Sequence, residues 1–282
     1  MDGRGPSRTA WGAATHRAAH QLLENGSIFH DPTAVTIAGM PESVIAEDAR
    51  AHPDRTPMRL FIAARHARGD EIVVAALRRG TRQVVILGAG LDTTAYRLVA
   101  PQGTTVFEVD HPATQDLKRE QVAAVGLEPV TALTHVGADF ERDSLLDALV
   151  RAGLDRQAAT VCLWLGVVPY LTGPGVEVTL RAIASLHAAE VVFDYSEPPS
   201  VHSGQAQTWR QADAQRVAAL GEPWLSHFDP PQLHALLASA GLDVVRDDHA
   251  GDLVRDYLGL SRNPTRRSGG HVLHASTPGP TG

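Results

Sequence analysis

The stretch Gln83-Val84-Val85-Ile86-Leu87-Gly88-Ala89-Gly90-Leu91-Asp92-Thr93 decides the fold of this chain. It opens with a run of β-branched and aliphatic residues, which is typical of a strand buried on both faces of a parallel sheet. Gly88 and Gly90 then allow a tight turn in which the backbone approaches a ligand without an intervening Cβ atom. A helix is expected from about Asp92, and its first N–H groups favour electron-rich ligand atoms. The stretch predicts one βα unit of an α/β fold, with a binding turn at its centre.

Six more apolar runs alternate with helical stretches after this unit. We expect strands at 104–109, 132–136, 160–165, 190–194, 242–246 and 271–275. Strands separated by helices imply right-handed crossovers and a mostly parallel sheet, although the last pair could include an antiparallel edge strand. The sequence thus predicts a Rossmann-like α/β fold with a seven-stranded, mostly parallel sheet.

Residues 7 to 80 read as helices only. Ser7 is a favourable N-cap for a first helix that Asn25-Gly26 ends, and Asp31-Pro32 starts a second helix. A longer helix is expected from about Met58 to Arg79, where apolar residues recur at helical spacing. These helices predict an N-terminal helical cap ahead of the sheet.

The chain is expected to form one folding unit with three parts. Residues 1–80 form the helical cap, residues 81–276 the ligand-binding core, and residues 277–282 a flexible tail. Within the core, residues 198–228 interrupt the strand pattern. The notable side chains of this segment are Trp209, Arg210, Arg216 and Trp224. The segment is either a lid that selects the substrate or a plain packing insertion.

The bulk composition is that of an ordinary globular domain, since 43% of the 282 residues are hydrophobic and 20% are charged. The net charge of −7 argues against nucleic-acid partners. The short basic cluster of Arg262, Arg266 and Arg267 reads as a solvated loop. No secretory signal follows Met1 and no run approaches 18 apolar residues, so we expect no membrane partner and a cytoplasmic location. The oligomeric state is not predicted.

The metal-binding residue types give no local motif. Cys162 is the only cysteine, so an intramolecular disulfide is impossible and a thiolate metal site is disfavoured. It stands in an apolar run and is expected to be a buried, inert thiol. The sequence has no His-Glu-x-x-His motif, and none of its 14 histidines stands at a distinctive spacing. We therefore expect no metal site.

An acid follows the second expected strand. Asp110 lies 22 positions beyond Gly88, where a carboxylate can accept hydrogen bonds from both ribose hydroxyls of an adenosine. Glu108 stands two residues earlier on the same strand, points the same way, and could share that role. The alternative is a carboxylate that caps the next helix. Together with the glycine turn, adenosine binding is the favoured interpretation.

Asp139-Phe140 follows the third expected strand. A carboxylate beside an aromatic ring can bond an adenine amino group while the ring packs on the face of the base. The alternative makes Asp139 a helix N-cap. The third glycine of a dinucleotide turn is replaced by Thr93. Because S-adenosylmethionine (SAM) has no pyrophosphate and needs no such glycine, this order of strand ends favours a SAM-dependent methyltransferase over a dehydrogenase.

The glycine turn and the acids at the next strand ends belong to a longer set of stretches in which the sequence resembles the leucine carboxyl methyltransferase family, in its bacterial branch of SAM-dependent methyltransferases. The resemblance covers nearly the whole chain, and its most specific part runs from Val84 to Leu98. The matching stretches are 7–10, 17–20, 29–32, Arg65 with Asp70, 83–93, 95–98 and 107–112.

The resemblance implies a class I methyltransferase fold with an N-terminal helical cap and SAM as the cofactor. It implies that Arg65 pairs with the SAM carboxylate, which suits a guanidinium that can bind bidentately. Gly88, in the turn with Gly90, would line the methionine portion. Asp110 would bind the ribose, and Asp139 with Phe140 would bind the adenine.

The sequence departs from the family at two positions. After the fourth strand the family usually has a Glu-Gly pair, whereas this chain has Leu165-Gly166. The change removes an expected contact to the ammonium group of SAM, and a charge-assisted hydrogen bond of this kind is worth roughly 1.5–3 kcal/mol. Thr94 also replaces a frequent arginine. Either SAM binds weakly to this chain, or another group substitutes for the lost acid.

We expect a SAM-dependent O-methyltransferase that acts on a carboxyl or hydroxyl oxygen of a small-molecule acceptor. A carboxylate is already ionised at neutral pH, whereas a phenol benefits from a base, and no catalytic residue is assigned. Tyr170 and Arg97 could line the site, with a structural role favoured for both. Two alternatives stay open: an NAD(P)-dependent oxidoreductase, and a repurposed relative that binds SAM without methylating.

Overall fold

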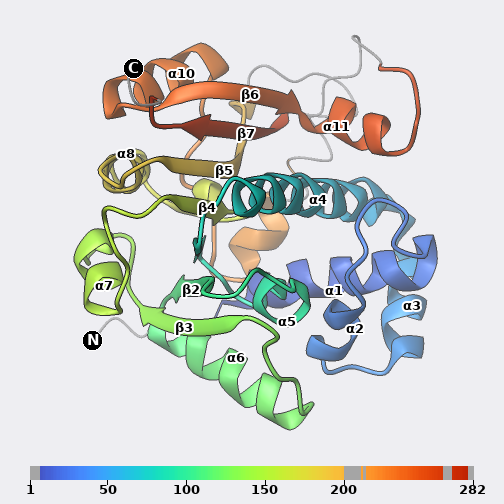
Figure 1. The fold of residues 1–282 in the computed structure, drawn as a ribbon. Coiled ribbons are helices and arrows are strands. Elements are labelled where there is room, and N and C mark those ends of the chain that lie inside the picture. Colours follow the sequence, from blue (N-terminus) through green and yellow to red (C-terminus); the bar gives the residue numbers. More distant parts are fainter. Residues whose placement is uncertain (1–6, 200–210, 212–213, 263–268, 279–282) are drawn as a thin grey trace.

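The computed structural model describes residues 7–199, 211, 214–262 and 269–278. A seven-stranded sheet of order β3-β2-β1-β4-β5-β7-β6 forms its centre, stacked in Figure 1 from β6 at the top to β3 near the bottom. The strands are β1 (Gln83–Leu87), β2 (Thr105–Asp110), β3 (Ala132–Gly137), β4 (Thr160–Trp164), β5 (Ala189–Ser196), β6 (Asp243–His249) and β7 (Gly270–Ser276). β1 to β5 pair in parallel, and β7 runs antiparallel to both of its neighbours.

Helices cover both faces of this sheet. They are α1 (Arg8–Glu24), α2 (Pro32–Ile37), α3 (Glu42–Ala51), α4 (Thr56–Arg78), α5 (Thr94–Arg97), α6 (Pro112–Ala124), α7 (Leu145–Arg151), α8 (Gly173–Ala184), α10 (Pro230–Ala240) and α11 (Ala250–Tyr257). Two short 3-10 turns, η1 (Pro53–Arg55) and η2 (Val168–Tyr170), precede α4 and follow β4. In Figure 1, α7 and α8 lie on the left, and α1, α2 and α3 gather on the right.

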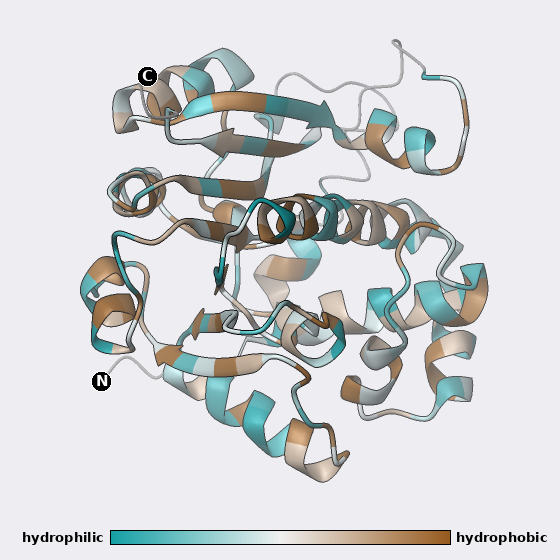
Figure 2. Ribbon diagram, in the orientation of Figure 1, coloured by the Kyte–Doolittle hydropathy of each residue, from teal (hydrophilic) through white to brown (hydrophobic). Residues whose placement is uncertain are grey.

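Every residue of β1 is buried, and successive side chains enter opposite cores. Val85 and Leu87 belong to the core under α7, α8 and α10, whereas Val84 and Ile86 belong to the core under α4 and α11. Figure 2 shows hydrophobic residues on the strands, while α6 carries hydrophilic residues. The glycine-bounded apolar run therefore predicted a central parallel strand correctly.

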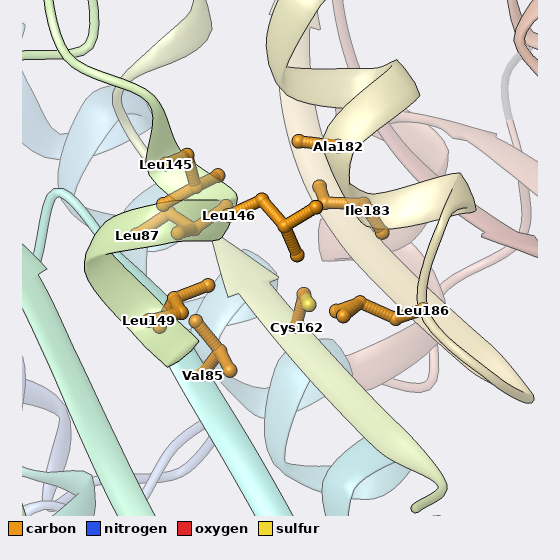
Figure 3. Close-up of a pocket in the computed structure, with 9 residues that line it drawn as sticks. All are labelled: Val85, Leu87, Leu145, Leu146, Leu149, Cys162, Ala182, Ile183 and Leu186. Carbon is orange, nitrogen blue, oxygen red and sulfur yellow. The ribbon is translucent and has the colours of Figure 1, made fainter. Parts of the chain in front are cut away.

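A small cavity lies in the first core, between α7, α8 and the sheet (Figure 3). Its volume is about 10 Å³, and aliphatic side chains and Cys162 line it. A void of this size holds at most one water and offers it no polar partner, so it is a packing defect and not a ligand site. Cys162 is buried, as expected. Burial raises the pKa of its thiol to about 12, which disfavours the reactive thiolate.

The expected elements are confirmed in most places and shifted in a few. Ser7 caps α1 by accepting from the N–H of Ala10, and Asp31 caps α2. The antiparallel partner in the last strand pair is confirmed, but the reversed strand, β7, lies inside the sheet and β6 forms the edge. β7 is buried on both sides, whereas the charged residues of β6 suit an edge. The helix expected at 142–152 begins later, at Leu145, because Ser144 is its N-cap.

Several expectations fall on residues that the structure does not describe. Trp209 and Arg210 of the expected lid lie outside the described residues, as do Arg266, Arg267 and most of the expected tail. Arg262 is described and pairs with Asp256, with Nη2 and Oδ2 2.6 Å apart. Within the described ranges, no helix combines the length and apolar character needed to cross a membrane.

A buried ion pair joins α6 to the sheet. Lys118 Nζ lies 2.7 Å from Glu108 Oε1, and both side chains are almost fully buried. Lys118 also donates to the carbonyl oxygen of Asp92, at 2.7 Å. Burial raises the pKa of Glu108, while Lys118 acts to lower it. Glu108 is therefore committed to the core, and the suggestion that it shares the ribose with Asp110 is wrong.

Lys118→Met is expected to destabilise the protein by about 3–5 kcal/mol near pH 7.5, because it leaves a buried carboxylate unpaired. Without Lys118 the folded-state pKa of Glu108 rises further above its unfolded value, so the folded state binds a proton that the unfolded state releases. The loss should therefore shrink as the pH falls toward 5. Urea unfolding at both pH values measures it.

The double variant Glu108→Gln with Lys118→Met is the control. It removes both charges, so it should recover most of the stability that Lys118→Met loses. Equal losses at the two pH values, or a double variant no more stable than Lys118→Met alone, would contradict the prediction.

Candidate cofactor site

The turn after β1 and the end of β2 meet at the carboxyl edge of the sheet. The N–H of Gly90 donates to Asp110 Oδ2 at 2.6 Å, and the N–H of His111 donates to Asp110 Oδ1 at 2.7 Å. Burial raises the pKa of Asp110, and these two hydrogen bonds act to lower it. The structure thus brings together the glycine turn and the acid that the sequence placed 22 positions apart.

The glycines of the turn are required by both conformation and space. Gly88 has φ +65° and Gly90 has φ +47°, values that residues with a Cβ rarely adopt. A Cβ on Gly88 would lie 2.3 Å from Val167 Cγ2, and a Cβ on Gly90 would lie 2.9 Å from the Cβ of Ala10. The start of α1 and the segment after β4 therefore enclose the turn from two sides.

A buried polar network anchors this turn to the helical cap. Asp31, fully buried at the start of α2, accepts from Arg17 Nε at 3.1 Å and from Thr93 Oγ1 at 2.8 Å. Arg17 Nη2 also donates to the carbonyl oxygen of Leu91 at 2.6 Å. Arg17, Asp31 and Thr93, which stand in stretches that carry the family resemblance, thus hold the turn in place.

Arg97 extends this buried polar network, because its Nε donates to Thr93 Oγ1 at 3.2 Å. Its guanidinium forms a two-point ion pair with Asp70, with Nη2 and Oδ1 2.7 Å apart, and lies 4.6 Å from the centre of the Phe29 ring. Burial raises the pKa of Asp70, and Arg97 acts to lower it. The structural role that the sequence favoured for Arg97 is the one observed.

Arg65 reaches the carboxyl edge from α4 and is buried, with 7% of its surface exposed. Its Nη1 donates to Asp194 Oδ2, on β5, at 2.9 Å, and the N–H of Gly166 donates to Asp194 Oδ1 at 2.5 Å. A Cβ on Gly166 would lie 2.6 Å from Arg65 Nη2. Arg65 Nε is buried and has no hydrogen-bond partner among the described residues.

Asp194 is the candidate site residue that sequence reasoning missed. Leu165, where the resemblance leads us to expect an acid, belongs to the apolar layer beside α4, and its Cδ1 would lie 3.2 Å from a Cβ on Gly69. The buried carboxylate beside Arg65 comes from the neighbouring strand instead. The sequence does contain a signal for this residue, because Asp194 is an acid at the carboxyl end of the fifth expected strand. That strand lies next to β4 in the sheet, and Leu165, which departs from the family pattern, directly follows β4.

Asp139 and Phe140 follow β3 at the same edge. The N–H of Ala138 donates to the carbonyl oxygen of Asp110 at 2.9 Å, which places the two strand ends side by side. Asp139 Oδ1 accepts from the N–H of Glu141 at 3.0 Å and so stabilises a turn. The alternative role as a helix N-cap is wrong, because Ser144 caps α7. Phe140 is partly buried against the core under α7 and α8.

The described part of the expected lid crosses this edge. The carboxylate of Glu222 accepts from the N–H groups of Arg8 and Thr9, at 2.6 and 3.2 Å, at the start of α1. The N–H of Leu225 donates to the carbonyl oxygen of Pro169 at 2.6 Å. Tyr170 lies between these contacts, and burial raises its pKa although hydrogen bonds with Trp224 and Thr9 act to lower it.

Comparison with known proteins agrees with this geometry. Residues 10–184 match the model of the leucine carboxyl methyltransferase family. The chain is 34% identical over 202 residues to a protein of Mycolicibacterium paratuberculosis (strain ATCC BAA-968 / K-10) inferred to be a SAM-dependent methyltransferase, covering 64% of each chain. A second protein of that strain with the same description is 33% identical over 228 residues, which cover 75% of this chain and 70% of the relative.

The fold agrees with a solved structure. A DUF574 family protein from Streptomyces avermitilis superimposes with a TM-score of 0.59 at 15% identity, over 94% of this chain and 97% of that one. The family match covers well over half of the chain and includes the glycine turn, Arg65, Asp110 and Asp139. The chain therefore belongs to the leucine carboxyl methyltransferase family and is a SAM-dependent methyltransferase with a Rossmann-like α/β fold.

Proposed function

We propose that the protein transfers the methyl group of SAM to a carboxyl or hydroxyl oxygen of a small-molecule acceptor. The observation that carries the cofactor part of this proposal is the buried guanidinium of Arg65 at the edge that also holds the glycine turn and Asp110. Its Nε–H has no partner among the described residues, so a donor remains for an anionic group. The methionine carboxylate of SAM is such a group, and Arg65 suits it.

The residues of the edge would divide the cofactor between them. Arg65 would bind the carboxylate, the backbone at Gly88 and Gly90 would lie along the methionine portion, and Asp110 would accept from the ribose hydroxyls. Asp139 and Phe140 would hold the adenine. These assignments extend the family resemblance to geometry in which Gly90 and Asp110 are already hydrogen-bonded.

Asp194 would supply the acid that the family has at position 165. Its two oxygens each accept one hydrogen bond, from Arg65 and from Gly166, which leaves acceptor capacity for the ammonium group of SAM. A carboxylate held by both a guanidinium and a backbone N–H is well oriented. This substitution weakens the case for a repurposed relative, which rested on Leu165.

SAM supplies an activated methyl group on its sulfonium, and the protein's part is to orient the acceptor and exclude water. We propose that the helical cap, residues 1–80, and the segment 198–228 exclude water from the site. The contacts of Glu222 with the start of α1, and of Leu225 with Pro169, favour the lid interpretation of that segment. Tyr170 would face the acceptor. A carboxylate acceptor would need no base.

Asp110→Ala is expected to weaken SAM and S-adenosylhomocysteine binding by about 10- to 100-fold, because the ribose hydroxyls lose a charged acceptor. Isothermal titration measures it. Asp116→Ala is the matched control, since Asp116 is exposed on α6 and forms an ion pair with Arg119 of the same helix. Unchanged affinity in Asp110→Ala, or no binding to the unaltered protein at millimolar ligand, would contradict the assignment.

Asp194→Asn and Arg65→Lys are expected to weaken S-adenosylhomocysteine binding by about tenfold or more, because both change contacts to its amino-acid end. Binding of 5′-methylthioadenosine, which lacks the carboxylate and ammonium, should stay unchanged. Asp110→Ala should weaken the binding of both ligands. Equal losses for the two ligands in Asp194→Asn would show that this residue acts only through the fold.

Incubation with methyl-labelled SAM and a panel of acids, phenols and amines tests the reaction class. We expect label on an oxygen acceptor, and mild alkali separates the two kinds of product because methyl esters hydrolyse and methyl ethers do not. Label that appears only on amines would refute O-methylation. SAM bound tightly but never consumed across the panel would favour the repurposed relative.

A further inference from the structure

A second cluster of ligand-type side chains lies at the same edge of the sheet, outside the cofactor residues. Glu197, His249 and His271 each offer one ligand atom, and these three atoms lie within 4.8 Å of one another. Glu197 and His271 are buried, with 6% and 9% of their surfaces exposed, and His249 is half-buried. A carboxylate and two imidazoles form a common donor set for a divalent transition metal.

The antiparallel insertion of β7 creates this cluster. His271, at the start of β7, pairs with Tyr195 of β5 on one side and with His249, the last residue of β6, on the other. Paired residues of neighbouring strands point to the same face of a sheet, and Glu197 lies two positions beyond Tyr195. The N–H of Glu197 donates to the carbonyl oxygen of Gly269 at 2.8 Å, which holds it beside β7.

The ring of His271 is fixed from behind by Asp247. His271 Nδ1 lies 2.9 Å from Asp247 Oδ1, and Asp247 Oδ2 also bonds Tyr195 Oη at 2.7 Å and His234 Nε2 at 2.8 Å. A carboxylate that accepts from one imidazole nitrogen orients the other nitrogen as a metal ligand.

The other nitrogen of His271 faces the cluster. His271 Nε2 is buried, has no hydrogen-bond partner among the described residues, and lies 3.8 Å from Glu197 Oε1. The ring of His249 stands edge-on to it, with centroids 5.3 Å apart and planes at 85°. His249 Nε2 accepts a long hydrogen bond, 3.4 Å, from the N–H of Gly269.

An ion pair between His271 and its two neighbouring carboxylates, without a metal, accounts for fewer of these side chains. A protonated His271 between Asp247 and Glu197 would account for two carboxylates, but it gives no reason for a second imidazole at the same point. A cation held by Glu197, His249 and His271 accounts for all three side chains and for the orienting Asp247. Ligand bonds to zinc are about 2.0–2.1 Å long, so the three ligand atoms would move closer together when the ion binds.

We propose that Glu197, His249 and His271 bind one divalent transition-metal ion of the zinc type. Three protein ligands leave a position for water or another oxygen ligand. The site belongs to β5, β6 and β7, whereas the cofactor residues lie on α4, β1, β2, β3 and β5. The proposal does not rest on the methyl-transfer reaction.

The test uses the full chain without a histidine tag, stripped with a chelator and then dialysed free of it. Co²⁺ titration followed by visible absorption, and competition by Zn²⁺, give the stoichiometry and affinity. We expect one ion per chain. Glu197→Gln, His249→Gln and His271→Asn should each weaken binding by more than about 100-fold, and Asp247→Asn by about 10- to 100-fold.

His274→Asn is the matched control, because His274 lies farther along β7 and pairs with Glu190, with Nε2 and Oε2 3.1 Å apart. It should bind Co²⁺ like the unaltered protein. S-adenosylhomocysteine affinity and circular dichroism, measured without metal, show that each variant is folded, and the isosteric Glu197→Gln is the variant least expected to disturb the fold. No stoichiometric binding, or binding that survives all three ligand variants, would overturn the proposal.

Discussion

The buried carboxylate of Asp31 is the constraint on which the cofactor site depends. It accepts from Arg17 on α1, from Thr93 in the turn after β1, and from the N–H of Ala34 in α2. Burying these charges is costly unless each has a partner, and removing one partner of a buried pair typically costs several kcal/mol. The network therefore ties the helical cap to the glycine turn, and the cap is part of the binding edge and not an addition to it.

A second buried pair joins Arg65 to Asp194, near the position where the chain departs from the family pattern. Leu165 contributes to the apolar layer beside α4, while Asp194 places its carboxylate against Arg65 and the N–H of Gly166. Adjacent parallel strands present their ends at one edge, so a carboxylate absent from the end of β4 can be supplied from β5. The departure from the family pattern is local, and the charge balance around Arg65 is kept.

The antiparallel β7 gives this edge its second chemical feature. A purely parallel order would leave β5 at the border of the sheet, whereas β7 pairs along the whole of β5 and brings β6 beside it. The histidines at the start of β7 and the end of β6 thereby meet Glu197. Two polar assemblies thus share one edge: one around the glycine turn, and one around Asp247 and His271.

The sequence alone determined the elements and the cofactor. β1 has the predicted bounds, because a β-branched run between glycines has few other conformations, and Ser7 and Asp31 mark the helix starts. The class of cofactor followed from the glycine turn, Asp110 and Asp139 at successive strand ends. These signals are local, or rest on the rule that parallel strand ends share an edge, so they can be read without coordinates.

Only the tertiary structure decided which charges are partners. Glu108 and Asp110 point the same way on one strand, yet Glu108 pairs with Lys118 and Asp110 meets the turn. Asp194 beside Arg65 is 129 residues away in the chain, and Glu197, His249 and His271 are 52 and 22 residues apart. No spacing rule reports such pairs, because strand order and register set them, and the free energy of burying a charge makes each depend on the whole fold.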